Sequence, residues 1–327
     1  MGNLRDRLKR IHEIKKEPVN SLKAGDHLDL LNLGWNSCGF NVLCREVDLP
    51  TSFKKIKSLP SELPILVPDL KYKELPGIED FLFFDLETTG LSGGAGTVAF
   101  LAAFGKIQNG RLKVTQYLLL DYPGENDFLE KTLLKLNAEN SVIVSYNGKT
   151  FDSQIIKTRC LMNRMKIPVY RHVDLLHPSR RLWKKNIQDC SQTSIETKIL
   201  GIFRDGDIPG ALAPEIWFEF LKTGNTERLM GICDHNLSDI SGLSEIFYAV
   251  IQIARDLFSA DKYNYNIERL ALSVYAFAYR QMTIGNYGKP LELINKAIEA
   301  MEPGTFLYNK LMRRKNRLEK LTAKNSS

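Results

Sequence analysis

Cysteine is scarce in this sequence, and long apolar runs are absent. The five cysteines are scattered and none forms a CxxC pair, so the spacing indicates neither a zinc ribbon nor a disulfide framework. No uninterrupted apolar stretch reaches the ~18 residues of a membrane-spanning helix, and the first ten residues carry charges where a secretion signal is apolar. We therefore expect a cytoplasmic protein with reduced thiols and no membrane partner.

The composition is that of a folded, mildly basic protein. The 327 residues are 43% hydrophobic, which is enough to fill a core and argues against a disordered chain. The formal net charge of +7 favours a polyanionic partner without identifying one.

The order of the apolar patterns predicts a mixed α/β sheet with flanking regions. Three strand candidates lie within residues 81–120, and Asn109-Gly110 between the second and third is a strong hairpin signal. A helix, a buried strand, a second helix and another strand follow, so we expect three antiparallel strands and then parallel strands, flanked by helices. The predicted domains are a basic helix with a proline-rich extension (1–78), the α/β domain (79–260) and a C-terminal helical region (261–327).

The C-terminal region contains the phrase GNYGKPLELINKAIEA (residues 285–300), which resembles one tetratricopeptide unit. Arrays of this kind generally need about three repeats, so a plain helical hairpin docked on the main domain is an equal alternative. In either case these helices are a candidate site for a protein partner.

Two acids interrupt the first strand candidate, FLFFDLETTG (residues 81–90). Residues i and i+2 of a strand share a face, so Asp85 and Glu87 would project together. Adjacent carboxylates repel each other unless one is protonated or a cation lies between them, and oxygen ligands favour Mg²⁺ or Mn²⁺. A strand that simply ends at the surface would also explain the pair.

Two later segments supply further candidate ligands. SYNGKTFD (145–152) follows a buried strand and begins a helix, which places Asp152 where open α/β sheets bind ligands, with helix capping as the alternative. Its GKT string is not a phosphate loop, because Ile143 stands where that motif has its first glycine. DHNLSDI (234–240) puts His235 and Asp239 on one helix face, where a local surface pair is the alternative.

FFDLETTG, YNGKTFD and HNLSD, in this order and at these separations, resemble the three motifs of the DEDD (DnaQ-like) exonuclease superfamily, and the rest of the chain resembles its YprB-type ribonuclease H-like family. The resemblance implies a ribonuclease H-like fold and a 3′–5′ exonuclease that hydrolyses DNA or RNA. It also implies two Mg²⁺ or Mn²⁺ ions held by Asp85, Glu87, Asp152 and Asp239, with His235 as the general base. His235 precedes Asp239 by four residues, the spacing of the subgroup that uses tyrosine there, whereas the histidine subgroup usually has five.

The same resemblance indicates contacts with the substrate. Thr88, Thr89 and Leu91 would touch the terminal nucleotide of a single-stranded end. Asn147 would bind the substrate or stabilise its own turn, and Phe151 would stack on a base or pack the start of the helix.

Positive charge is concentrated between residues 157 and 185. Nine basic residues, including Arg180 and Arg181, accompany a single acid, Asp174. This stretch would steer a nucleic-acid backbone or form a solvated helix face.

Two alternatives to an exonuclease remain open. The first is a nucleic-acid-binding scaffold with a vestigial nuclease site, although decay would be expected to remove at least one of the four carboxylates. The second is a structure-selective endonuclease on the same fold, because the motifs specify metal chemistry and not the need for a strand end. The sequence does not choose between DNA and RNA.

Overall fold

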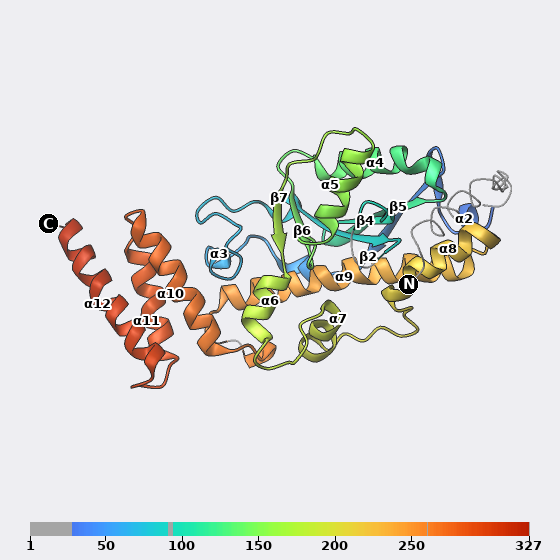
Figure 1. Ribbon diagram of the computed structural model, residues 1–327. Helices are drawn as coiled ribbons and strands as arrows, with labels where there is room; N and C mark the ends of the chain where they lie inside the picture. The colour runs from blue at the N-terminus through green and yellow to red at the C-terminus, as the bar shows by residue number, and fades with distance from the viewer. Residues whose placement is uncertain (1–27, 91–93, 260, 327) are drawn as a thin grey trace, which may run out of the picture.

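A seven-stranded mixed sheet forms the centre of the structure, a computed structural model that describes residues 28–90, 94–259 and 261–326 (Figure 1). The predicted basic helix at the start of the chain and Leu91 lie outside the described residues. The strand order is β1-β2-β5-β4-β3-β6-β7. The strands are β1 (Asn36–Gly39), β2 (Val42–Leu49), β3 (Phe81–Thr88), β4 (Ala99–Gln108), β5 (Arg111–Leu119), β6 (Val142–Ser145) and β7 (Arg171–Asp174).

The strand pairing confirms the predicted fold class. β3, β4 and β5 pair antiparallel, and β6 and β7 then continue the sheet parallel to β3. Asn109 and Gly110 both have positive φ and form the predicted hairpin between β4 and β5. β1 and β2 precede residue 78 but extend the same sheet through β5, while the predicted domain limits stay a prediction.

Helices cover both faces of the sheet and continue beyond it. α4 and α5 lie on one face, the long helix α9 crosses the other, and α10, α11 and α12 pack together past the end of α9 (Figure 1). The helices are α2 (Leu28–Asn32), α3 (Leu63–Leu66), α4 (Glu125–Leu136), α5 (Asp152–Met162), α6 (Leu176–Trp183), α7 (Gln192–Ile195), α8 (Ala213–Thr223), α9 (Glu227–Arg255), α10 (Ile267–Thr283), α11 (Gly288–Glu299) and α12 (Phe306–Ser326), with a π-helical turn, η4 (Glu196–Leu200), after α7.

The C-terminal region is helical, as predicted. Gly285 and Gly304, both with positive φ, lie in the turns that separate its three helices, where a residue without a Cβ accepts that conformation at little cost. Its assignment as a tetratricopeptide unit stays a prediction.

Side chains alternate between the two faces of β3, and two acidic residues lie on the face that contacts α9. Phe81 and Phe83 pack on the α9 side of the sheet, and the ring of Phe81 lies 4.8 Å from that of Phe247 on α9. Residues two and four positions beyond Phe83 share its face, and they are Asp85 and Glu87. The face of β3 that contacts α9 therefore changes from apolar to acidic along the strand.

α9 is a core helix, and side chains from other segments approach it closely at two of its glycines. Its length and mean hydropathy would suit a membrane span, but 61% of its most apolar window is buried inside the fold, as in the core helix of a globular protein. A Cβ on Gly231 would lie 2.2 Å from Ile208, and one on Gly242 would lie 1.8 Å from the carboxylate of Glu196. Gly242 therefore lets an acidic side chain from η4 lie directly against α9.

Candidate metal centre

β3 presents Asp85 and Glu87 toward α9, and one hydrogen bond ties the two elements together. The amide Nδ2 of Asn236, on α9, donates to Asp85 Oδ2 at 2.7 Å. Glu87 is buried, with 8% of its surface exposed. Asp85 is half-buried, so neither acid lies at an exposed strand end.

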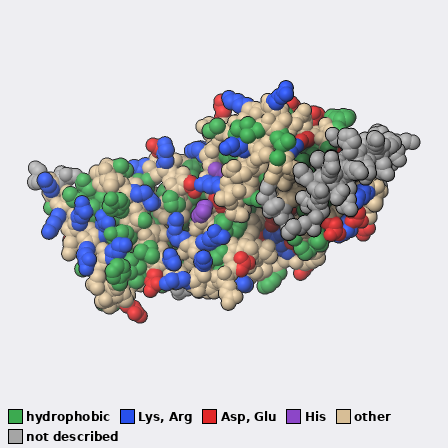
Figure 2. Space-filling view, in the orientation of Figure 1, with side chains coloured by type: hydrophobic (Ala, Val, Ile, Leu, Met, Phe, Trp, Pro, Cys, Tyr) green, Lys and Arg blue, Asp and Glu red, His purple; other side chains and the backbone are tan. Residues whose placement is uncertain are grey.

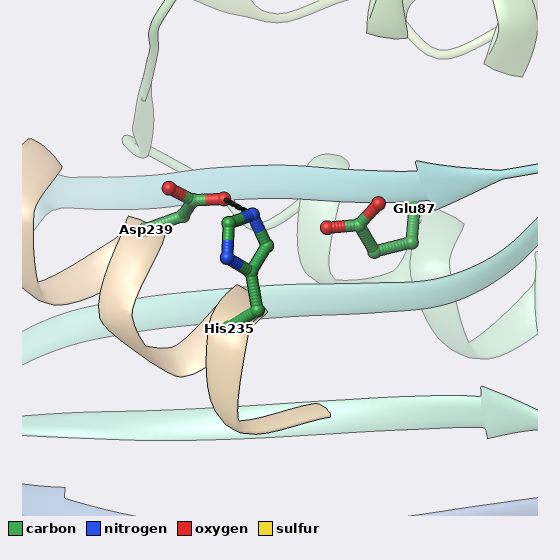
Figure 3. Close-up of side chains that lie close together, drawn as sticks. All are labelled: Glu87, His235 and Asp239. Atoms are coloured by element: carbon green, nitrogen blue, oxygen red, sulfur yellow. Dashed lines mark ion pairs between the residues drawn. The ribbon is translucent and has the colours of Figure 1, made fainter. Parts of the chain in front are cut away.

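His235 and Asp239 lie one turn apart on α9 (Figure 3). His235 Nε2 is 3.2 Å from Asp239 Oδ2, and Figure 3 shows Glu87 facing this pair from the sheet. Glu87, His235 and Asp239 each offer a ligand atom, and these atoms all lie within 4.8 Å of one another. The structure thus brings together residues from the first and third predicted motifs.

Asp152, from the second motif, is the first residue of α5 and is buried. Burial, together with the charges of Asp85, Asp174 and Asp239, raises its pKa well above the ordinary value. The charges of Asp85 and Asp239 thus act on Asp152, and that of Asp152 acts on Glu87, although neither Asp85 nor Asp152 is part of the group whose ligand atoms lie within 4.8 Å of one another.

Asp174, at the end of β7, holds the loop that leads to Asp152. Its carboxylate accepts hydrogen bonds from the backbone N–H groups of Asn147 (2.8 Å) and Lys149 (3.1 Å). A Cβ on the intervening Gly148 would lie 2.7 Å from Asp152 Oδ2, so glycine leaves the space that this carboxylate occupies. Asp174 thus has a structural part in positioning the second motif.

The pKa values describe an excess of buried negative charge. Burial and the charge of Asp239 raise the pKa of Asp85 to about 7. Burial and the charge of Asp85 likewise raise the pKa of Glu87 well above its ordinary value. Loss of water and mutual repulsion both disfavour the ionised carboxylates, so a bound cation would stabilise this group of residues.

Asp239 differs from the other acids because two cationic side chains contact it. Burial alone would raise its pKa, but the hydrogen bonds and charges of His235 and Arg204 hold it below the ordinary value. Arg204 Nη2 donates to Asp239 Oδ1 at 2.8 Å, while His235 Nε2 contacts Asp239 Oδ2. Both oxygens of Asp239 are therefore engaged within the protein.

His235 is held between two carboxylates. Its Nδ1 lies 2.7 Å from Asp207 Oδ1, which leaves Nε2 directed at Asp239. Burial by itself lowers the pKa of the imidazole, but the hydrogen bond and charge of Asp239, with the hydrogen bond of Asp207, raise it to about 9.

The residues present fit a divalent cation with oxygen ligands. Among the residues described, no side chain or backbone group donates a hydrogen bond to Glu87 or Asp152, although both are buried. Buried carboxylates without donors and with raised pKa values suit Mg²⁺ or Mn²⁺. Each oxygen of Asp239 has a second lone pair, so Asp239 can bind an ion while it keeps its contact with Arg204.

Sequence reasoning missed the ion pair that supports Asp239. Glu196 is fully buried and forms two hydrogen bonds of 2.7 Å with Arg204, and Arg204 Nη1 lies 3.3 Å from Asp207. The segment FRDGDIPG (203–210) has the composition of a surface turn, so its charges gave no signal of burial.

A second buried polar chain was also missed. Arg45 Nε donates to Gln116 Oε1 at 2.7 Å, Gln116 Nε2 donates to Asn236 Oδ1 at 2.8 Å, and Asn236 in turn donates to Asp85. Gln116 and Asn236 are fully buried. A glutamine inside the apolar strand LKVTQYLLL was the available signal, because a buried amide needs partners.

The predicted contacts of Thr88 and Thr89 with substrate stay predictions. Thr88 Oγ1 donates to the carbonyl of Gly90 at 2.9 Å, and Thr89 Oγ1 accepts from the Val98 backbone N–H at 2.9 Å. Both hydroxyls therefore shape the turn after β3.

The remaining candidates for substrate binding occupy different surroundings. Asn147 has a φ of 65° in the loop before α5, and Phe151 packs against the core on the α4 and α5 side. Arg180 is exposed, whereas Arg181 is half-buried and donates to the carbonyl of Leu66 at 3.0 Å. Arg181 thus supports the proline-rich segment, and the substrate roles of all four remain predictions.

A family described as the RNase_H superfamily matches residues 82–251, more than half of the chain. The chain belongs to this superfamily. The matched segment contains Asp85, Glu87, Asp152, His235 and Asp239.

One relative of this chain is a Bacillus subtilis (strain 168) protein named "Uncharacterized protein YprB", which is 34% identical over 245 residues. The match covers 73% of this chain and 58% of the relative, so the chain spans less than two thirds of that protein. Among solved structures, the family B DNA polymerase of the hyperthermophilic archaeon Pyrobaculum calidifontis is similar, with a TM-score of 0.42 and 15% identity, over 61% of this chain and 29% of the polymerase.

Proposed function

We propose that this protein is a metal-dependent 3′–5′ exonuclease of the DEDD type that hydrolyses phosphodiester bonds of DNA or RNA at a single-stranded end. The observation that carries the proposal is that ligand atoms of Glu87, His235 and Asp239 lie within 4.8 Å of one another, while the charges of Asp85 and Asp152 act on the same acidic residues. Four carboxylates balance the charge of two divalent ions, which is more than a structural role requires. The same intact set argues against a vestigial site.

In this proposal the four carboxylates hold the ions, and neighbouring side chains orient the carboxylates. Two bound Mg²⁺ or Mn²⁺ ions would lower the pKa of the attacking water and neutralise charge on the leaving oxygen. Arg204 fixes the orientation of Asp239, and Asn236 fixes that of Asp85. These contacts limit the reorganisation of the ligands during the reaction.

His235 is the proposed general base. Asp207 binds Nδ1 and fixes the ring, so Nε2 is the nitrogen that faces the carboxylates and would accept a proton from water. Nε2 is thus assigned to proton transfer, and Nδ1 to the orientation of the ring.

The experiment compares the wild type with Asp85→Asn on 5′-labelled single strands of DNA and RNA. The amide can still accept from Asn236, and a neutral group suits a site that already raises the pKa of Asp85 to about 7, so the fold should be retained. We expect a ladder of products shortened from the 3′ end with Mg²⁺ or Mn²⁺, no products with EDTA, and a rate about 10³-fold lower in the variant.

An unchanged rate in Asp85→Asn would contradict the proposal. A circular single strand separates the two nuclease modes, because it has no end. If the circle is cut as fast as the linear strand, the activity is that of an endonuclease on the same fold.

A further inference from the structure

The C-terminal helices carry a basic groove that lies apart from the metal centre. We call it the tail groove; its volume is about 410 Å³, and no acidic side chain lines it. Figure 2 shows Lys and Arg side chains gathered over this end of the molecule. The lining residues are Tyr275, Phe306, Asn309, Lys310, Arg313, Arg314 and Arg317.

Arg314 and Lys310 are ordered on aromatic rings within the tail groove. Arg314 Nη2 donates to the Tyr275 hydroxyl at 2.6 Å, and its guanidinium lies 4.5 Å from the centre of the Tyr275 ring and 5.0 Å from that of Tyr279. Lys310 Nζ lies 4.5 Å from the Tyr275 ring. These contacts hold the charges in place without neutralising them.

Arg313 and Arg317 have no such partners. They lie one helical turn apart on α12, and neither forms an ion pair or hydrogen bond with any residue that the structure describes. Lys315, on the same helix, instead lies 3.9 Å from Glu319. The tail groove therefore presents two uncompensated guanidinium groups in a row, a geometry that suits successive anions on one chain.

An exposed aromatic ring accompanies these cations. Phe306, at the start of α12, is 84% exposed, and Tyr279 beside Arg314 is 53% exposed. Aromatic side chains interleaved with unpaired cations are the arrangement that binds single-stranded nucleic acid, since bases stack on the rings while phosphates meet the charges.

A membrane surface fits the tail groove less well. A membrane-binding helix needs a free apolar face, but Leu311 and Leu318 of α12 are fully buried against the neighbouring helices. We infer that the tail groove binds the phosphate backbone of single-stranded nucleic acid, upstream of the 3′ end that the metal centre would hydrolyse. The inference deepens the proposed function and rests on it for the identity of the strand.

The separation of the two sites sets the length of strand required. From Asp239 to Arg255, α9 alone rises about 24 Å, which corresponds to roughly seven nucleotides at ~3.4 Å each. Oligomers much shorter than this should not reach both sites.

The experiment measures fluorescence anisotropy of 5′-fluorescein-labelled oligo(dT) and oligo(U) of about 20 nucleotides, longer than the span estimated from the helix. EDTA is present throughout, so that no hydrolysis occurs. The double variant Arg313→Gln/Arg317→Gln should reduce the slope of log K against log salt by about 1.4, because each single-strand phosphate contact contributes about 0.7. Phe306→Ala should lower affinity about fivefold or more and leave the slope unchanged.

The matched control is Lys113→Gln/Lys222→Gln, which removes the same charge from exposed positions on β5 and α8. An unchanged slope in the Arg313/Arg317 variant, or an equal reduction in the control, would overturn the inference. The inference would also be overturned if the Arg313/Arg317 variant still binds the oligomers but no longer binds phosphatidylserine vesicles or polyglutamate.

The assay separates this inference from the proposed function because it needs neither metal nor cleavage. If metal-dependent hydrolysis is normal but Arg313→Gln/Arg317→Gln binds oligomers as the wild type does, the tail-groove inference is wrong and the proposed exonuclease function stands. A reduced slope together with unchanged hydrolysis in Asp85→Asn overturns the exonuclease alone.

Discussion

The imidazole of His235 lies between the carboxylates of Asp207 and Asp239, and these contacts govern its protonation. With a pKa of about 9 in this arrangement, His235 is protonated at neutral pH and cannot accept a proton. The hydrogen bond and charge of Asp239 make the largest contribution that raises this pKa. A cation bound to Asp239 offsets that contribution, so His235 is expected to become a base only in the metal-loaded site.

We predict that His235→Ala slows hydrolysis by roughly 10²–10⁴-fold and retains Mn²⁺ binding, because the imidazole transfers a proton and is not needed as a ligand. Single-turnover rates and a Mn²⁺ titration check the two parts. His177→Ala is the control, since His177 is exposed on α6. Wild-type rates in His235→Ala would mean that another group activates the water.

Arg204 is expected to act through Asp239. In Arg204→Met/Glu196→Met the buried ion pair is replaced by apolar side chains, so the fold should be kept. Arg204→Met alone leaves the buried carboxylate of Glu196 without its cationic partner and should cost about 3–5 kcal/mol. We expect the double variant to lose about 10–100-fold in Mn²⁺ affinity or turnover. Thermal unfolding and a Mn²⁺ titration measure both effects, and a double variant with wild-type affinity would show that Asp239 needs no such support.

The candidate ligands could be predicted from the sequence because each lies in a segment with its own local signal. Asp85 and Glu87 interrupt an apolar strand, and His235 and Asp239 are spaced by one helical turn. Glu196 and Arg204 could not be predicted, because their burial depends on the gap at Gly242, a contact between distant parts of the chain.

At the scale of elements, the distance between α9 and the sheet sets the geometry of the site. Gly105 of β4 allows a close approach, since a Cβ there would lie 2.5 Å from Ile240 Cγ2 and 3.0 Å from Leu112 Cδ1. Ile240 directly follows Asp239 on α9. Any displacement of the helix therefore moves a candidate ligand.

Gly105→Ala should destabilise the protein by about 1–3 kcal/mol, because the added methyl group overpacks the interface. Denaturant unfolding measures the change in free energy, and hydrolysis should fall as well. Gly96→Ala is the control: no atom lies within 4 Å of its Cβ position, so its effect should stay within about 1 kcal/mol. Equal stability of the two variants would contradict this account of the interface.

The main elements from β3 to α9 followed from periodicity, but the extent of the sheet did not. β2 pairs with β5, about 70 residues further along the chain. The sequence places β2 in the predicted N-terminal extension (1–78) and does not predict its pairing, because register between distant strands depends on the folded sheet.

At the scale of the whole molecule, α9 connects the metal centre to the C-terminal helices. Its N-terminal half supplies His235 and Asp239, and its C-terminal half shares the core that continues into α10, α11 and α12. α9 thus spans part of the distance between the candidate metal centre and the tail groove, which is lined by residues of α10 and α12. This arrangement suits a strand that is bound at one site and processed at the other.

The most direct test of the metal centre is a titration with Mn²⁺, with the free ion followed by electron paramagnetic resonance. The pKa of Asp85 is raised to about 7, and those of Glu87 and Asp152 are also raised, so protons compete with the metal below that pH. We predict two bound ions per chain at about pH 8, much weaker binding at about pH 5, and loss of at least one ion in Asp85→Asn. No binding at the higher pH, or equal binding in the variant, would contradict the account.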